Sequence, residues 1–256
     1  MPADPLTPAR PQPPGGDGGD PKAATPVGAL AGPPAVRLAE VRLCVLLDAQ
    51  PDAAGFERLF TSLLAAGVRM FQLRDKAAPD AVILDRARRG VARARQADAR
   101  APALVTINDR VSLAGAAGID GVHVGGRDLP VKAARELLGP AAIIGRTAHD
   151  MAEARAASNE GADYLGIGPC FPSATKSFAS QAPREFLRQA ATEIPRPVFA
   201  IGGITTERLG ELAALGIHRV AVSAAITAAP DPAAAARDFL TALRASDRPP
   251  RLPRRD

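Results

Sequence analysis

The sequence predicts an α/β protein that folds as a single (βα)8 barrel, also called a TIM barrel. Eight short apolar segments alternate along the chain with stretches rich in Ala, Leu and Arg. Four of these segments follow a helical stretch that ends in Gly, which is typical of helix-to-strand connections. Polar residues follow nearly every apolar segment, as expected when binding residues form a ring at the carboxyl ends of the strands. An open doubly wound sheet is the main alternative, and it would gather these residues near one switch point.

The predicted strands are short and consist mainly of Val, Ile, Leu and Ala. Near-continuous apolar runs of this kind are typical of parallel strands that are buried on both faces. The intervening stretches have the length and composition of helices, as the crossover connections of a parallel sheet require. The strands are expected at 41–47, 68–73, 103–107, 121–124, 141–145, 164–168, 197–202 and 219–223.

The two ends of the chain differ in composition from the rest. The first 34 residues contain ten Pro and six Gly, and a stretch of this composition cannot bury enough apolar surface to offset its ordering entropy. The last residues are rich in Arg and Pro. We therefore expect disordered tails at 1–35 and 244–256, and one barrel domain at 36–243.

Composition excludes several classes of protein. No apolar run is long enough to span a membrane, and a secretory signal is not expected at the start of the chain. The two cysteines have neither a metal-binding nor a redox spacing. These observations together favour a cytoplasmic protein. The net charge is +5 and the pI is about 9.8. Residues 245–256 supply +2 of that charge, and the chain has one Tyr and no Trp, so a basic, aromatic nucleic-acid surface is not expected. A small anionic substrate accounts for the basic excess equally well.

The ends of the seventh and eighth predicted strands favour a phosphate site. Gly202 and Gly203 follow one strand and Ser223 follows the other. Barrels often bind phosphate between these two loops through backbone N–H groups, and glycine lets the backbone approach an oxyanion closely. The alternative is a simple tight turn with Ser223 as a helix cap.

A second anion site is indicated after the second strand, where Gln72, Arg74 and Lys76 share one side by the period of two. Asp109 and Asp128 follow the third and fourth strands, and two neighbouring carboxylates suit Mg²⁺. Each Asp could instead cap the helix that follows it, and the basic residues could form a solvated loop with Arg–Asp pairing. Because one subsite suits a monophosphate and the other a magnesium-bound pyrophosphate, the two together indicate a group transfer in which pyrophosphate leaves.

The loop after the sixth strand adds hydroxyl groups beside Lys176, a combination that can close over a phosphorylated ligand. An ordinary polar loop is the alternative. His123 and His149 are expected to be packed or hydrogen-bonded residues rather than catalysts. Cys44 is expected in the core, and no base can be assigned to Cys170.

In this order, these residues resemble the thiamine phosphate synthase family. The resemblance spans almost the whole predicted barrel and rests on QLRDK (72–76), INDRVSLA (107–114), GVHVGGRDLP (121–130), IIGRTAHD (143–150), DYLGIGPCFPSATK (163–176), VFAIGGI (198–204) and VAVSAAI (220–226). It implies an enzyme that joins hydroxymethylpyrimidine pyrophosphate to thiazole phosphate, yielding thiamine phosphate and pyrophosphate. The implied partners are these small phosphorylated substrates, with neither nucleic acid nor membrane, and the oligomeric state stays open.

The resemblance also implies roles for individual positions. Arg74, Lys76, Thr147 and Lys176 would be catalytic, and Asp109 and Asp128 would hold Mg²⁺. The pyrimidine pyrophosphate would be bound by Gln72, Leu73, Arg74, Asp75, Lys76, Asn108, Thr147 and Lys176. The thiazole phosphate would be bound by Ser173, Ala174, Thr175, Gly203, Val222 and Ser223.

The chain departs from the family pattern at a few positions. Gly126 and Arg127 stand where the family usually has Gln and an acidic residue, and Thr147 replaces a usual Ser. Two other hypotheses stay open. One is a thiazole tautomerase-like relative, which would bind only the thiazole phosphate. Such a protein would not need four residues that this chain has, namely Asn108, Asp109, Asp128 and Lys176. The other is a non-catalytic barrel that binds thiazole phosphate.

Overall fold

The computed structural model describes residues 32–48, 52–172 and 180–246. Its strands are β1 (Leu43–Leu47), β2 (Met70–Leu73), β3 (Leu104–Asn108), β4 (Gly121–Val124), β5 (Ile143–Ala148), β6 (Tyr164–Ile167), β7 (Val198–Ile201) and β8 (Val220–Val222). They pair in parallel and in sequence order, and β8 returns to β1 to close the barrel. This confirms the predicted (βα)8 fold.

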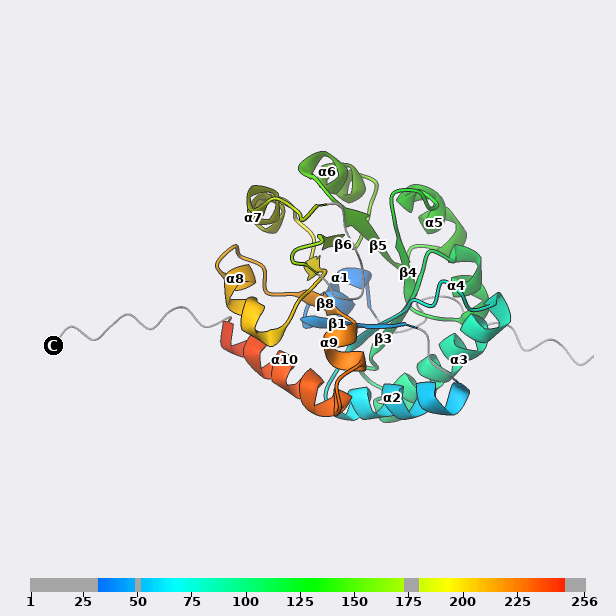
Figure 1. The fold of residues 1–256 in the computed structure, drawn as a ribbon. Helices are drawn as coiled ribbons and strands as arrows, with labels where there is room; N and C mark the ends of the chain where they lie inside the picture. Colours follow the sequence, from blue (N-terminus) through cyan, green and yellow to red (C-terminus); the bar gives the residue numbers. More distant parts are fainter. Residues whose placement is uncertain (1–31, 49–51, 173–179, 247–256) are drawn as a thin grey trace, which may run out of the picture.

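Helices surround the closed sheet (Figure 1). They are α1 (Pro34–Leu38), α2 (Ala53–Ala65), α3 (Asp80–Ala97), α4 (Val111–Ala117), α5 (Val131–Leu138), α6 (Met151–Asn159), α7 (Arg184–Glu193), α8 (Leu209–Ala213), α9 (Ala224–Thr227) and α10 (Pro232–Ser246), with a 3-10 turn, η1 (Thr206–Arg208). Since α1 begins at 34 and α10 ends at 246, the described elements reach past both predicted domain limits, 36 and 243.

The apolar residues of the strands divide between two cores. On β1, Leu43, Val45 and Leu47 pack outward against the helices, whereas Cys44 and Leu46 point into the barrel. Successive side chains of a strand alternate between its faces, and both faces are buried here, so the strand reads as an uninterrupted apolar run. The inner core is completed by residues at the same level of neighbouring strands, such as Met70 and Ala221, which lie opposite Cys44 in the register.

Helix α1 closes the amino-terminal end of the barrel. Leu38, its last residue, is fully buried and belongs to the inner core. Arg37 forms a buried ion pair with Asp120, which immediately precedes β4, and donates to the carbonyl of Ala141 at 3.2 Å. The sequence did not predict this helix, because Pro33 and Pro34 at its start resemble the preceding tail in composition.

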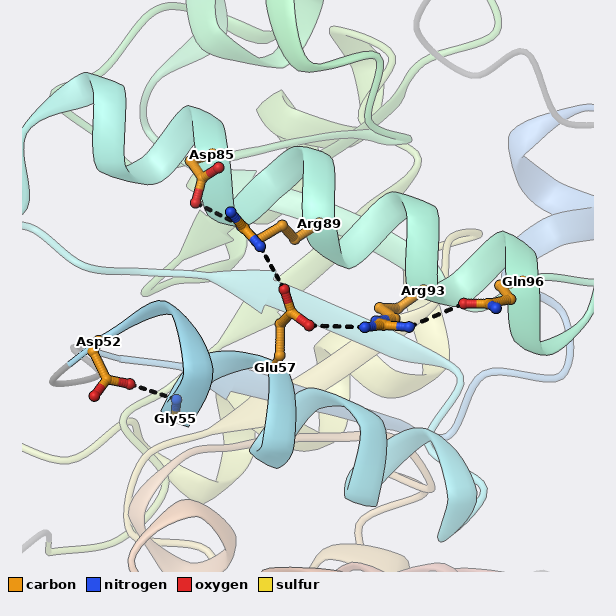
Figure 2. Close-up of polar contacts among 7 residues, drawn as sticks. All are labelled: Asp52, Gly55, Glu57, Asp85, Arg89, Arg93 and Gln96. Carbon is orange, nitrogen blue, oxygen red and sulfur yellow. Dashed lines mark hydrogen bonds and ion pairs between the residues drawn. The ribbon is translucent and has the colours of Figure 1, made fainter.

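The basic charge of α3 is largely matched by carboxylates. Glu57 of α2 accepts from Arg89 at 2.6 Å and from Arg93 at 2.9 Å, and Asp85 accepts from Arg89 at 2.8 Å (Figure 2). Exposed ion pairs of this kind contribute little stability each. They do show that these arginines lie against acidic partners between two helices.

Candidate active site

A cavity of about 840 Å³ opens at the carboxyl-terminal end of the barrel. Residues from the ends of all eight strands contribute to its wall, from Leu46 on β1 to Ala225 after β8. This is the end at which a (βα)8 barrel places its binding residues, because the strand-to-helix loops converge there. The cavity is therefore the candidate active site.

Most of the predicted site residues in the described part of the chain line this cavity. They are Gln72, Arg74, Lys76, Asn108, Asp109, Asp128, Thr147, Gly203, Val222 and Ser223. The predicted residues Ser173, Ala174, Thr175 and Lys176 lie outside the described residues. Described residues predicted for each of the two subsites thus line one continuous cavity.

Leu73 and Asp75 are the predicted residues that lie outside the main cavity. Leu73 packs in the outer core and is 3% exposed. Asp75 accepts from Arg86 at 2.9 Å and from the backbone of Ala77 and Ala78. Burial acts to raise the pKa of Asp75, but these hydrogen bonds hold it below its usual value. The period of two explains both positions, since only Gln72, Arg74 and Lys76 face the cavity.

Asp109 and Asp128 lie close together on one side of the cavity. Burial and the neighbouring Asp128 carboxyl raise the pKa of Asp109, while Lys76, 3.4 Å away, opposes the shift. Asp109 also has a left-handed backbone with φ of 63°, which is uncommon for a residue other than Gly. Two neighbouring carboxylates supply oxygen donors of the kind that Mg²⁺ prefers, so the residues present fit this ion.

Neither Asp acts as the helix cap that the sequence left open. The residue before α4 is Arg110 and the residue before α5 is Pro130, and neither helix has a side-chain cap. Asp128 instead accepts from the backbone N–H of Gly125 at 2.7 Å, which closes the loop after β4. The carboxylates are held at the cavity by loop geometry rather than by helix ends.

Two of the cationic side chains that line the cavity are paired with carboxylates. Arg74 lies 3.3 Å from Asp48, and Lys76 lies 3.4 Å from Asp109. These pairs place positive charge on the side of the cavity formed by β1, β2 and β3. An anion bound there would compete with the carboxylates for the same cations.

A hydrogen-bonded chain extends from the wall of the cavity into the inner core of the barrel. His123 Nε2 lies 2.8 Å from Thr147 Oγ1, and its Nδ1 lies 3.1 Å from the hydroxyl of Tyr164. Burial lowers the pKa of His123 to about 4, so the imidazole is neutral and has one donor and one acceptor nitrogen. The ring therefore orients the Thr147 hydroxyl, in agreement with the expectation that His123 is a hydrogen-bonded residue.

The loops after β6 and β7 approach each other closely. Gly202 and Gly203 have φ values of 97° and 61°, and a Cβ at Gly203 would lie 2.2 Å from the carbonyl oxygen of Pro172. The contact with that loop therefore requires glycine here. Arg208 donates to the carbonyl of Gly203 at 2.7 Å and lies 4.8 Å from the centre of the Phe171 ring. Arg208 was not predicted from the sequence, because it belongs to no motif. Its two contacts form only where the loops after β6 and β7 meet.

Comparisons with known proteins agree with this architecture. A family model described as thiamine monophosphate synthase matches residues 43–226. The chain belongs to this family. Its relatives include thiamine-phosphate synthase of Mycobacterium tuberculosis (strain ATCC 25177 / H37Ra), 41% identical over 224 residues, which cover 82% of this chain and 98% of the relative.

Another member of the thiamine monophosphate synthase family, from Gloeobacter violaceus, is 42% identical over 207 residues, which cover 81% of this chain but 59% of that relative. For the relative from Rhodopirellula baltica the share is 51%, so the chain spans little more than half the length of these two relatives. Among solved structures, thiamine phosphate pyrophosphorylase from Pyrococcus furiosus superposes with a TM-score of 0.72 at 29% identity, covering 82% of this chain and 98% of that one. A 3-hexulose-6-phosphate synthase, at 17% identity and a TM-score of 0.63, shares the fold.

The positions that depart from the thiamine monophosphate synthase pattern also line the cavity. Gly126 and Arg127 form part of its wall beside Asp128. A Cβ at Gly126 would meet nothing within 4 Å, so the loop has room for the larger side chain that the family usually carries there. Within the described ranges, no helix combines the length and hydropathy needed to cross a membrane.

Proposed function

We propose that the protein is a transferase that condenses hydroxymethylpyrimidine pyrophosphate with thiazole phosphate, producing thiamine phosphate and pyrophosphate. The observation that carries this proposal is that one cavity is lined both by cationic and carboxylate side chains and by the loops after β7 and β8. A protein that binds only one phosphorylated ligand needs only one of them. Membership of the thiamine monophosphate synthase family supports the same activity.

The first subsite would bind the pyrophosphate of the pyrimidine substrate. Arg74 and Lys76 supply positive charge, and Gln72, Asn108 and Thr147 supply hydrogen-bonding groups on the same wall. Asp109 and Asp128 would hold Mg²⁺. When bound, that ion stabilises negative charge on the departing pyrophosphate. The proposed contribution of Lys176 is a further cation for the same group.

The second subsite would bind the phosphate of the thiazole. Gly203, Val222 and Ser223 come from the ends of β7 and β8, the two strands whose loops often bind phosphate in this fold. Backbone N–H groups are suitable donors to a phosphate, and the glycines leave the backbone accessible. Ser173, Ala174 and Thr175 are proposed to complete this subsite.

The reaction needs no nucleophile from the protein. The bond between the pyrimidine methylene carbon and the pyrophosphate oxygen breaks, with the electron pair leaving on oxygen, and the lone pair of the thiazole nitrogen forms the new C–N bond. The aminopyrimidine ring delocalises the positive charge between these events. The side chains act by binding and orienting the two substrates and by stabilising charge, which is where preorganised groups have their largest effect.

The cysteines of the described chain do not suggest an alternative mechanism. Burial raises the pKa of both Cys44 and Cys170 to about 12, so neither is a ready thiolate. Small phosphorylated substrates as partners and a cytoplasmic location, both predicted from the sequence, are part of this proposal.

The test is a coupled assay for pyrophosphate, with each substrate omitted in turn. Release that requires both substrates and produces thiamine phosphate supports the proposal. Binding of thiazole phosphate without release would indicate a non-catalytic barrel, and conversion of the thiazole alone would indicate a tautomerase-like activity. Either result would refute the proposed synthase.

A further inference from the structure

Asp48 contacts both proposed subsites at once. It directly follows β1 and lines the cavity. One carboxylate oxygen, Oδ1, lies 3.3 Å from Arg74 Nη1 in the pyrophosphate subsite. The other, Oδ2, accepts the hydroxyl of Ser223 in the thiazole phosphate subsite. The carboxylate therefore lies at the junction where the two substrates would meet.

Asp48 differs from the other carboxylates that line the cavity. Asp109 and Asp128 lie beside each other, and the Asp128 carboxyl helps to raise the pKa of Asp109. Asp48 contacts an arginine and a hydroxyl instead, and it follows β1, whereas the pair follows β3 and β4, with β2 in between. Its side chain is 45% exposed, so it can reach a ligand in the cavity.

A carboxylate between two phosphate-binding subsites needs a positive partner. In the structure Arg74 is that partner. A bound pyrophosphate would attract Arg74 strongly, because charge-assisted pairing of arginine with phosphate is among the strongest polar contacts. The negative charge of Asp48 would then repel both substrates unless a new positive charge arose near it.

The proposed reaction creates such a charge at the junction of the subsites. As the carbon–oxygen bond breaks, positive charge develops on the pyrimidine methylene carbon and its ring. After the C–N bond forms, the charge remains on the thiazolium ring of the product. We propose that Asp48 is a catalytic residue that stabilises this positive charge, an inference that rests on the proposed synthase function. Asp48 forms no covalent bond and transfers no proton, and the electron pairs move as described above.

The decisive variant is Asp48→Asn, which keeps the shape and an oxygen acceptor for Ser223 but removes the charge. We expect kcat to fall about a hundredfold, the scale for losing one preorganised group that stabilises transition-state charge. The KM values of both substrates should change by less than about threefold, because the positive charge is absent from the ground state. Asp52→Asn is the matched control. It makes the same chemical change at the cap of α2, outside the cavity, and should leave kcat unchanged.

A binding measurement separates charge stabilisation from a structural role. Thiamine phosphate carries the thiazolium charge, whereas thiazole phosphate has the same phosphate on a neutral ring. Calorimetry should show that Asp48→Asn weakens binding of thiamine phosphate about tenfold, without weakening that of thiazole phosphate. Asp48→Glu retains the charge and should keep the preference for the charged ligand.

Three results would overturn the proposal. One is an Asp48→Asn enzyme with normal kcat and a raised KM for the pyrimidine substrate, which would show that Asp48 only positions Arg74. The second is an equal loss of affinity for the charged and neutral ligands. The third is loss of the ligand preference in Asp48→Glu. If the unaltered protein releases no pyrophosphate, the proposed function itself fails, and this result is distinct from an active protein that is insensitive to Asp48→Asn.

Discussion

Substituting Asp120 tests how the amino-terminal end of the barrel is held. Asp120 precedes β4, accepts the backbone N–H of Val105 at 2.7 Å and pairs with Arg37 of α1. The paired side chains are 6% and 5% exposed. Asp120→Ala would leave the Arg37 guanidinium and the Val105 N–H buried without this acceptor. Removing one partner of a buried ion pair costs about 3–5 kcal/mol of unfolding free energy.

Asp163 provides a matched control on another strand. It precedes β6, accepts the backbone N–H of Ile144 at 2.7 Å and pairs with Arg135 at 2.6 Å. This pair is more exposed, with side chains 15% and 25% accessible, and Arg135 also donates to several carbonyls. Asp163→Ala should therefore cost about 1.5–3 kcal/mol, the value of a hydrogen bond to a charged group.

The assay is urea unfolding followed by far-ultraviolet circular dichroism, because the chain has no Trp and only one Tyr. A double variant, Arg37→Met with Asp120→Asn, removes both charges and keeps an acceptor for Val105. It should recover most of the loss, since replacing a buried ion pair with neutral groups is often nearly neutral in stability. An Asp120→Ala variant that loses less than about 1 kcal/mol, or no more than Asp163→Ala, would refute the reasoning.

Further predictions concern the cavity and the core. Asp109→Asn and Asp128→Asn should each lower turnover about a hundredfold in steady-state assays with Mg²⁺, because charge stabilisation by the metal is lost. Equal activity of the unaltered protein with EDTA and with Mg²⁺ would contradict this metal assignment. Tyr164→Phe removes the hydroxyl that pairs with the buried imidazole nitrogen at the cavity wall and should cost about 1–3 kcal/mol in thermal or urea unfolding. An unchanged midpoint would show that the hydroxyl is dispensable. Because burial raises the pKa of Cys44 and Cys170 to about 12, neither thiol should react with a thiol-specific dye at about pH 8 until urea is added, and rapid labelling of the folded protein would refute their burial.

Much of the fold could be predicted because the burial of a strand and the end of a helix both depend on residues that are close together in the sequence. A strand covered on both faces is apolar throughout, and a helix that turns into such a strand commonly ends at Gly. The first pattern located all eight strands, and the second marked four of the helix-to-strand connections. The period of two also placed Gln72, Arg74 and Lys76 on the cavity side, although the family resemblance added Leu73 and Asp75, which the structure places outside the main cavity.

Helix α1 was not predictable in the same way. Pro33 and Pro34 at its start match the composition of the residues before it, and its five residues carry no periodic pattern long enough to indicate a helix. Its position depends on Leu38 filling the open end of the barrel and on the pairing of Arg37 with Asp120, 83 residues away. Those partners come together only once the barrel has closed.

The sequence by itself determined the alternation of strands and helices, the shared side of Gln72, Arg74 and Lys76, and the residue types at the strand ends. Only the tertiary structure decided which of these residues are neighbours. Asp48 and Ser223 are 175 positions apart in the chain and become hydrogen-bonded because β8 pairs with β1. Local patterns report the burial of a residue and its secondary structure, whereas the contact between two distant side chains depends on how the whole sheet closes.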